Sequence, residues 1–287
     1  MSATETLPAT TRMGPVHLTV ADLARSVGYY ETAIGLETLE RADGRATLGA
    51  GPAPLLVLAE EPGAGPVRGA TGLYHFALLV PGRADLARWL AHAARDRVQL
   101  TGLSDHFVSE AIYLRDPDHH GIEIYADRPR EVWAGKVMER MTTLPLDVDS
   151  LLGELADPES APFDGLPSGT AMGHVHLKVA EIPETVRFYR DIVGLDVTAA
   201  LGNQAAFFSA GGYHHHIGGN TWESSGGGPP PPGSAALRHA TMVLPTAEDR
   251  DALRDRLAAA GHEPDETPGG PLVRDPSGNA LVLGVDA

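Results

Sequence analysis

The sequence contains no cysteine and is poor in basic residues. Without cysteine, disulfides and thiolate metal sites are excluded, so any transition metal would have to be held by histidine and carboxylate groups. Lys and Arg total 22 against 38 Asp and Glu, which gives a formal net charge of -16. This balance argues against nucleic acid or an anionic membrane surface as a partner, whereas a small neutral molecule is compatible with it.

Long apolar runs are also missing. No stretch approaches the roughly 18 to 20 apolar residues of a membrane span, and the first residues, MSATETLPATTRMG, lack the charged-then-apolar pattern of a secretory signal. We therefore expect a cytoplasmic protein with no membrane partner. With 287 residues, of which 43% are apolar and 21% charged, the chain is long enough for one large or two medium domains.

The chain does contain internal repeats, which are a direct guide to its fold. The segments GPVHLTVADLARSVGYYETAIGLE (14–37) and GHVHLKVAEIPETVRFYRDIVGLD (173–196) match almost position for position, and weaker copies cover 73–94 and 237–261. Each segment reads as a strand followed by an amphipathic helix, and short strand-like runs follow. The sequence predicts an α+β fold of four βαβββ modules.

The repeats divide the chain into two halves. Residues 10–130 hold modules 1 and 2, and residues 171–287 hold modules 3 and 4. Between them, residues 131–170 form a charged, proline-containing linker with a short helix expected near 148–155. The run GGGPPPPG (226–233) is expected to be a loop between modules 3 and 4.

Each opening strand carries a histidine, and two longer motifs accompany the repeats. The histidines are His17, His75, His176 and His239. The motifs are DHFVSEAIYLRDPDHHGIEIY (105–125) and GGYHHHIG (211–218). Together with the four modules, these motifs resemble the vicinal oxygen chelate superfamily and, within it, the catechol 2,3-dioxygenases, over nearly the whole chain.

This resemblance implies that the modules pair into two open, barrel-like mixed sheets. It also implies an extradiol dioxygenase that cleaves a small aromatic diol with O₂ and depends on Fe(II), or on Mn(II) in its place. Non-haem Fe(II) oxygenases commonly hold the metal on one face with two histidines and one carboxylate. Glu123 suits the carboxylate role, because strand alternation turns it away from Ile122 and Ile124 and so into the barrel.

The resemblance further implies the residues around the metal. His106 and Tyr113 match hydrogen-bond and proton partners of the family, and His215 matches the histidine taken to stabilise bound oxygen. If the histidine run is extended, successive side chains alternate, so His214 and His216 share a face opposite to His215.

Neither half contains the complete set of site residues. The first half has no counterpart of His215, and the second has Val282 where the ligand carboxylate is expected. Pairing module 2 with module 3 would supply His75, His176 and Glu123 as metal ligands, with His106, Tyr113 and His215 around them. The rival arrangement is a site of His17, His75 and Glu123 within the first half. We prefer the crossed pairing because catalysis needs all these groups near one metal.

The other histidines are expected to be structural. His17 and His239 would be satisfied by barrel neighbours, and His174 would lie at the rim because it opens its strand. His119 and His120 follow an Asp-Pro-Asp turn and are expected to be exposed.

Two other function classes share this scaffold. A glyoxalase-like isomerase or transferase typically uses two carboxylates or glutamine among four ligands, whereas only Glu123 is available here. A drug-binding resistance protein would have no use for His106, Tyr113 and His215. The oligomeric state is open, although exposed sheet edges are often covered by a second chain, which would make a homo-oligomer.

Overall fold

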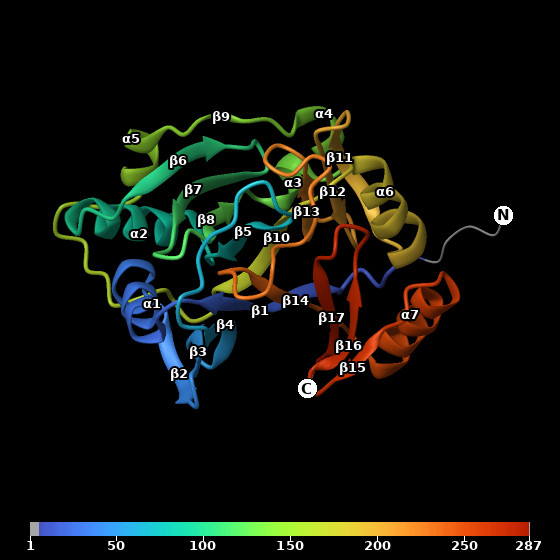
Figure 1. Ribbon diagram of the computed structural model, residues 1–287. Coiled ribbons are helices and arrows are strands. Elements are labelled where there is room, and N and C mark those ends of the chain that lie inside the picture. Colours follow the sequence, from blue (N-terminus) through green and yellow to red (C-terminus); the bar gives the residue numbers. More distant parts are fainter. Residues whose placement is uncertain (1–5, 287) are drawn as a thin grey trace.

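The computed structural model describes residues 6–286 (Figure 1). Two parts of the chain lie outside the described residues: residues 1–5, where the segment that lacks a secretory signal pattern begins, and residue 287, the last of the second half. Within 6–286, no helix combines the length and the apolar character needed to cross a membrane.

The four predicted modules are present, each with an opening strand, a helix and further strands. Module 1 contains β1 (Arg12–Val20), α1 (Leu23–Tyr29), the π-helical turn η1 (Tyr30–Ile34), β2 (Glu37–Ala42), β3 (Arg45–Ala50) and β4 (Ala53–Glu60). Module 2 contains β5 (Gly72–Leu79), α2 (Arg83–Arg95), β6 (Leu100–Asp105), β7 (Ser109–Arg115) and β8 (Gly121–Asp127). Module 3 contains β10 (Ala171–Lys178), α6 (Ile182–Val186), the π-helical turn η2 (Arg187–Val193), β11 (Asp196–Leu201), β12 (Ala205–Ser209) and β13 (Ile217–Asn220). Module 4 contains β14 (Leu237–Leu244), α7 (Ala247–Ala259), β15 (Asp265–Thr267), β16 (Gly270–Arg274) and β17 (Ala280–Val285).

The helical segments of modules 1 and 3 end alike. Gly35 and Gly194 close them with φ angles of 87° and 90°. These values lie in the left-handed region, which glycine adopts without the steric cost of a Cβ atom. At the other end of α1, the side chain of Asp22 accepts a hydrogen bond from the Arg25 amide and caps the helix.

The modules pair across the two halves of the chain. One sheet has the order β15-β16-β17-β14-β1-β4-β3-β2, and the other has the order β11-β12-β13-β10-β5-β8-β7-β6-β9. The opening strands of the paired modules lie antiparallel, β1 beside β14 and β10 beside β5 (Figure 1). The crossed pairing of module 2 with module 3, and of module 1 with module 4, is therefore confirmed.

Sequential modules still contact each other through their Asp-Pro turns. The Tyr30 hydroxyl of module 1 donates to Asp116 Oδ2 of module 2 at 2.8 Å. The equivalent pair in the second half is Tyr189 and Asp275, at 3.2 Å. All four residues are buried, and buried polar groups need such partners. The repeat thus produces the same stabilising contact twice.

One of the two histidines after the Asp116 turn is not exposed as expected. His119 is exposed, with a φ of 68°. His120 is buried, and its Nε2 lies 2.9 Å from the carbonyl oxygen of Thr19. The prediction for His120 was wrong because the turn packs against β1 of the other sheet, a contact that local sequence does not reveal.

The segment between the halves forms short helices and one short strand, and the strand joins the second sheet. It contains α3 (Arg130–Trp133), α4 (Val137–Arg140), β9 (Leu144–Pro145) and α5 (Val148–Leu152), the last within the predicted helical stretch. β9 pairs with β6 and becomes the edge of that sheet (Figure 1). The expected loop at 226–233 has neither helix nor strand.

Candidate metal centre and its cavity

Two polar side chains of the second sheet face each other across a single alanine. His174 of β10 is opposite Ala77 of β5, and Ala77 is in turn opposite Glu123 of β8. The small Ala77 side chain leaves room for the flanking side chains to converge above it. His174 Nε2 lies 3.1 Å from Glu123 Oε2.

His75 completes the cluster from β5. It lies two residues before Ala77 and therefore on the same face of the strand. Its Nε2 is 2.9 Å from Glu123 Oε2, yet this buried nitrogen has no hydrogen-bond partner among the described residues. The ligand atoms of His75, Glu123 and His174 all lie within 4.8 Å of one another, and all three residues are buried.

The charges of this cluster suit a cation. Burial opposes ionisation of Glu123, but the nearby His174 and His75 outweigh it and hold the pKa of Glu123 well below its usual range. Burial lowers the pKa of His174 to about 4. At neutral pH an ionised carboxylate therefore lies beside a neutral imidazole, which are the protonation states that metal ligands need. Two histidines and one carboxylate are also the donor set of non-haem Fe(II) sites, so these residues fit such an ion.

His176, expected as a ligand, lies beside the cluster and is not part of it. In the strand register it is opposite His75, with the ring centroids 5.0 Å apart, and it is not opposite Ala77. His174 had been placed at the rim as the first residue of its strand. Because β10 begins earlier, at Ala171, His174 lies well inside the sheet, in the row that leads to Glu123.

The rival ligand His17 lies in the other sheet. It stacks on His239 with ring centroids 3.9 Å apart. Val282 of β17, opposite Thr241 of the neighbouring strand β14, supplies no carboxylate. The structure thus keeps His17 away from Glu123, as the crossed pairing requires.

Tyr113 and His106 form a hydrogen-bonded chain next to Glu123. Tyr113 is opposite Glu123 in the register of β7 and β8. His106 Nε2 lies 2.7 Å from the Tyr113 hydroxyl, and His106 Nδ1 lies 2.7 Å from the carbonyl oxygen of Thr142. Because a carbonyl can only accept, we assign the proton to Nδ1, so that Nε2 accepts from Tyr113. Burial, and then Glu123, raise the pKa of Tyr113 well above its usual range, which keeps its hydroxyl protonated.

The histidine run is not a strand, because β13 begins only at Ile217. The predicted alternation of side chains therefore does not apply to it. His215 nevertheless lines the same cavity as His75, Glu123 and His174. Its ring centroid lies 4.0 Å from that of His174 and 5.0 Å from that of Phe207.

The two neighbours of His215 point to different partners. His214 is fully buried, and its Nε2 lies 2.8 Å from Asp127 Oδ1. Its Nδ1 lies 2.8 Å from Nδ1 of His215. His216 instead lies with its Nδ1 3.2 Å from the hydroxyl of Ser209. Sequence reasoning missed Asp127 because nothing in the sequence marks a contact between the end of β8 and the histidine run.

The cluster, Tyr113, His106 and His215 line one cavity of about 680 Å³. Its other lining residues include Tyr74, Met138, Met141, Leu201, Phe207 and Trp222. Two of these, Met138 and Met141, come from the segment between the halves, and so does Thr142, the carbonyl partner of His106. No sequence motif pointed to them.

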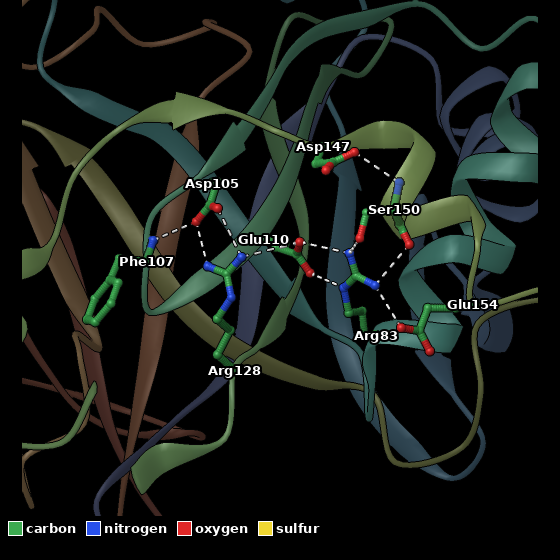
Figure 2. Close-up of polar contacts among 8 residues, drawn as sticks. All are labelled: Arg83, Asp105, Phe107, Glu110, Arg128, Asp147, Ser150 and Glu154. Atoms are coloured by element: carbon green, nitrogen blue, oxygen red, sulfur yellow. Dashed lines mark hydrogen bonds and ion pairs between the residues drawn. The ribbon is translucent and has the colours of Figure 1, made fainter. Parts of the chain in front are cut away.

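A network of charged side chains fixes the segment between the halves to module 2 (Figure 2). Arg83, at the start of α2, donates to Glu110 Oε2 at 2.6 Å and to Glu154 Oε1 at 2.7 Å. It also donates to the Ser150 carbonyl oxygen at 3.0 Å. Arg128 approaches the other oxygen of the buried Glu110, at 3.4 Å. α5 is thereby tied to the strand that carries Tyr113.

Comparison with known proteins gives consistent matches over most of the chain. A family model described as the Glyoxalase/Bleomycin resistance protein/Dioxygenase superfamily matches residues 12–124 and 171–283. The chain is 41% identical over 280 residues to the Catechol-2,3-dioxygenase of Bacillus subtilis (strain 168), covering 95% of this chain and 96% of that protein.

Two solved structures share the fold. A protein described as a dioxygenase from Bacillus subtilis subsp. subtilis str. 168 has a TM-score of 0.65 at 14% identity, covering 98% of this chain and 86% of that one. Glyoxalase I from Zea mays has a TM-score of 0.57 at 17% identity, covering 96% and 92%. At these identities the likeness shows the fold alone.

Proposed function

Because this chain belongs to the Glyoxalase/Bleomycin resistance protein/Dioxygenase superfamily, we propose that it is an extradiol dioxygenase that uses O₂ and Fe(II), with Mn(II) as a substitute, to open a catechol-type ring. The observation that carries this proposal is the convergence of His75, His174 and Glu123 in the lining of a cavity that Tyr113 and His215 also line. The relative named Catechol-2,3-dioxygenase, which matches 95% of the chain, supports the reaction class.

His75, His174 and Glu123 would hold the metal. Bound Fe(II) supplies open coordination positions and the redox chemistry that lets O₂ react with an aromatic diol. The three ligands come from adjacent strands and line the cavity, so a diol in the cavity reaches the ligand cluster directly. His174 takes the place that sequence reasoning gave to His176, because only His174 shares a row with Glu123.

Tyr113 and His106 would move a proton on one side of the diol. His106 Nε2 is free of its own proton and accepts from the Tyr113 hydroxyl. When the diol loses a proton, this pair can receive it at Nε2 of His106 through the Tyr113 oxygen. Thr142 holds the imidazole in the tautomer that makes this transfer available. Positioned acid and base groups of this kind contribute typically about 10² to 10⁴ in rate.

His215 would serve as the acid or base group beside His174. The Asp127 carboxylate can only accept, so His214 donates to it from Nε2. His214 Nδ1 then accepts from Nδ1 of His215, which leaves Nε2 of His215 unprotonated. This arrangement orients the His215 ring and sets which of its nitrogens carries the proton.

Oxygen consumption tests the proposed reaction. The purified protein is loaded with Fe(II) without air, and O₂ uptake and the yellow ring-opened product are followed after catechol is added. We expect uptake that requires both the metal and the diol, and weaker or equal uptake with Mn(II). An isomerase, a transferase or a drug-binding protein would consume no O₂, so the absence of metal-dependent uptake with catechol and with substituted catechols would refute the proposal.

The remaining expectations from the sequence stay predictions. They are a cytoplasmic location, no nucleic-acid partner, a homo-oligomeric state, and the division of the chain into a first half at 10–130, a linker at 131–170 and a second half at 171–287. Size-exclusion chromatography with light scattering tests the oligomeric state directly.

A further inference from the structure

Exposed apolar side chains gather at the cavity. The exposed large apolar residues of the described chain are Leu39, Val132, Met138, Leu144, Leu201 and Trp222. Three of them line the cavity: Met138 is 59% exposed, Leu201 57% and Trp222 47%. Apolar side chains left in solvent around a concave site indicate that a ligand covers them.

Met141, which is partly buried, extends this apolar lining toward the core of the protein. It packs on one side against Ala199 and Phe207 of module 3. On its other side it packs against Trp133 and Val137 of the segment between the halves. α4 thus lies against β11 (Figure 1). Met138 and Met141 both line the cavity, and we call these two residues, which belong to neither module, the methionine wall. Unbranched thioether side chains adapt readily to apolar groups of different shape.

Few cationic side chains line the cavity: Arg140, next to Met141 in the sequence, is not among the lining residues. Arg115 is the one lysine or arginine among the described cavity-lining residues. It donates to the carbonyl oxygen of His119 at 3.0 Å. Its positive charge opposes the rise that burial causes in the pKa of Tyr74 and adds to the fall that burial causes in the pKa of Lys178. A carboxylate placed against the methionine wall would therefore lose water without gaining a cationic partner, which is costly.

The cavity is also larger than a bare diol ring requires. Its volume of about 680 Å³ is in the range of sites for drug-sized ligands. A diol at His75, Glu123 and His174 would fill only part of this volume, whose lining also includes Phe207 and the methionine wall. A substituent on the ring would occupy the remaining space.

We propose that the substrate is a catechol carrying an uncharged, apolar substituent, alkyl or aryl, and that the methionine wall selects it. The inference rests on the proposed function, and it makes the segment between the halves a determinant of specificity. Met138 and Met141 contact the substituent, while the ligand cluster binds the diol. A carboxylated substituent of the same length is disfavoured.

Two diols of matched length test this preference: 4-butylcatechol and 3-(3,4-dihydroxyphenyl)propanoate. Dissociation constants are measured anaerobically on the Fe(II)-loaded protein, and kcat/KM is then measured with O₂. We expect 4-butylcatechol to be favoured at least about tenfold in both measurements, since a few apolar contacts are worth about 10- to 200-fold in discrimination. No preference, or a preference for the carboxylate, would overturn the inference.

Variants with a lysine in place of one apolar side chain test whether the methionine wall causes this preference. Met141→Lys is expected to reduce the ratio between the two diols at least about tenfold, because it offers the carboxylate a partner. Met138→Lys, at an exposed position, provides the same test if Met141→Lys does not fold. Val132→Lys is the matched control: Val132 is exposed on the same segment and does not line the cavity, so its ratio should equal that of the parent chain. Equal ratios in all variants would refute the role of the wall.

The reaction and the binding preference are tested separately. If no diol supports metal-dependent O₂ uptake, the proposed dioxygenase activity is wrong. The anaerobic dissociation constants then still decide whether the methionine wall favours an apolar group, because they do not depend on turnover.

Discussion

His174 and Glu123 lie 3.1 Å apart, Nε2 to Oε2, although they are 51 positions apart in the chain and belong to strands that are not neighbours in the sheet. β5 separates β10 from β8, and only the small side chain of Ala77 lies between the two residues in the sheet. The contact therefore exists only because module 2 pairs with module 3.

Glu123→Gln should lose tight Fe(II) binding and nearly all ring cleavage. The amide keeps the size of the side chain but removes the negative charge that the cation needs. Iron content after gel filtration and O₂ uptake with catechol measure the effect, and circular dichroism shows whether the fold persists. Normal iron content and turnover would show that Glu123 is not a ligand.

His174→Ala and His176→Ala should differ in metal content. The first removes a residue of the buried cluster and is expected to abolish stoichiometric iron binding. The second removes a neighbour of the cluster, so iron should remain while turnover changes. His17→Ala, in the other sheet, is the control and should leave both unchanged. Loss of iron in His176→Ala with retention in His174→Ala would restore the ligand set inferred from the sequence.

Tyr113→Phe should keep iron and slow turnover by about 10² to 10⁴, the usual contribution of a positioned proton donor. The phenyl ring preserves the packing and removes only the hydroxyl that bonds to His106. Iron content, kcat and KM for catechol are measured together. If the variant instead lost its metal, Tyr113 would have to be a ligand.

The stacked pair of His17 and His239 should weaken the fold in acid. Burial lowers the pKa of His17 to about 3, with His239 adding to the effect, and burial lowers that of His239 to about 4, against a normal value of 6.5. Below about pH 6.5 the unfolded chain binds protons that the folded chain does not, so stability falls as the pH falls toward these values. Urea unfolding of the His17→Gln, His239→Gln double variant at several pH values should show a shallower decline. An unchanged decline would mean that these histidines titrate normally in the folded protein.

Arg83→Met should destabilise the protein by about 1 to 3 kcal/mol, the cost of leaving a buried charged group short of a partner. Glu110, which is buried, would keep only its longer contact with Arg128. Urea unfolding measures the change. Arg190→Met removes an ion pair exposed on both sides and should change stability far less. Similar effects of the two variants would show that the network in Figure 2 has no special role.

The sequence by itself determined the four modules and the choice of partners between modules. That choice followed from chemistry: His106, Tyr113 and Glu123 lie in module 2, whereas the matching His215 lies in module 3. The modules are local features, and their pairing follows from which residue types the site requires close together. Both can be inferred from the order of residues in the sequence.

Only the tertiary structure decided which histidine faces the carboxylate. His174 and His176 are two positions apart on one strand and share a face, so periodicity alone cannot separate them. The antiparallel register of β10 with β5 places His174 in the row of Glu123, and register depends on long-range packing. For the same reason the sequence did not reveal the roles of the Thr142 carbonyl and the methionine wall. Every residue has a backbone carbonyl, so residue type does not mark one that takes part in a site. The wall forms only because a connecting segment folds over a module that is distant in the sequence.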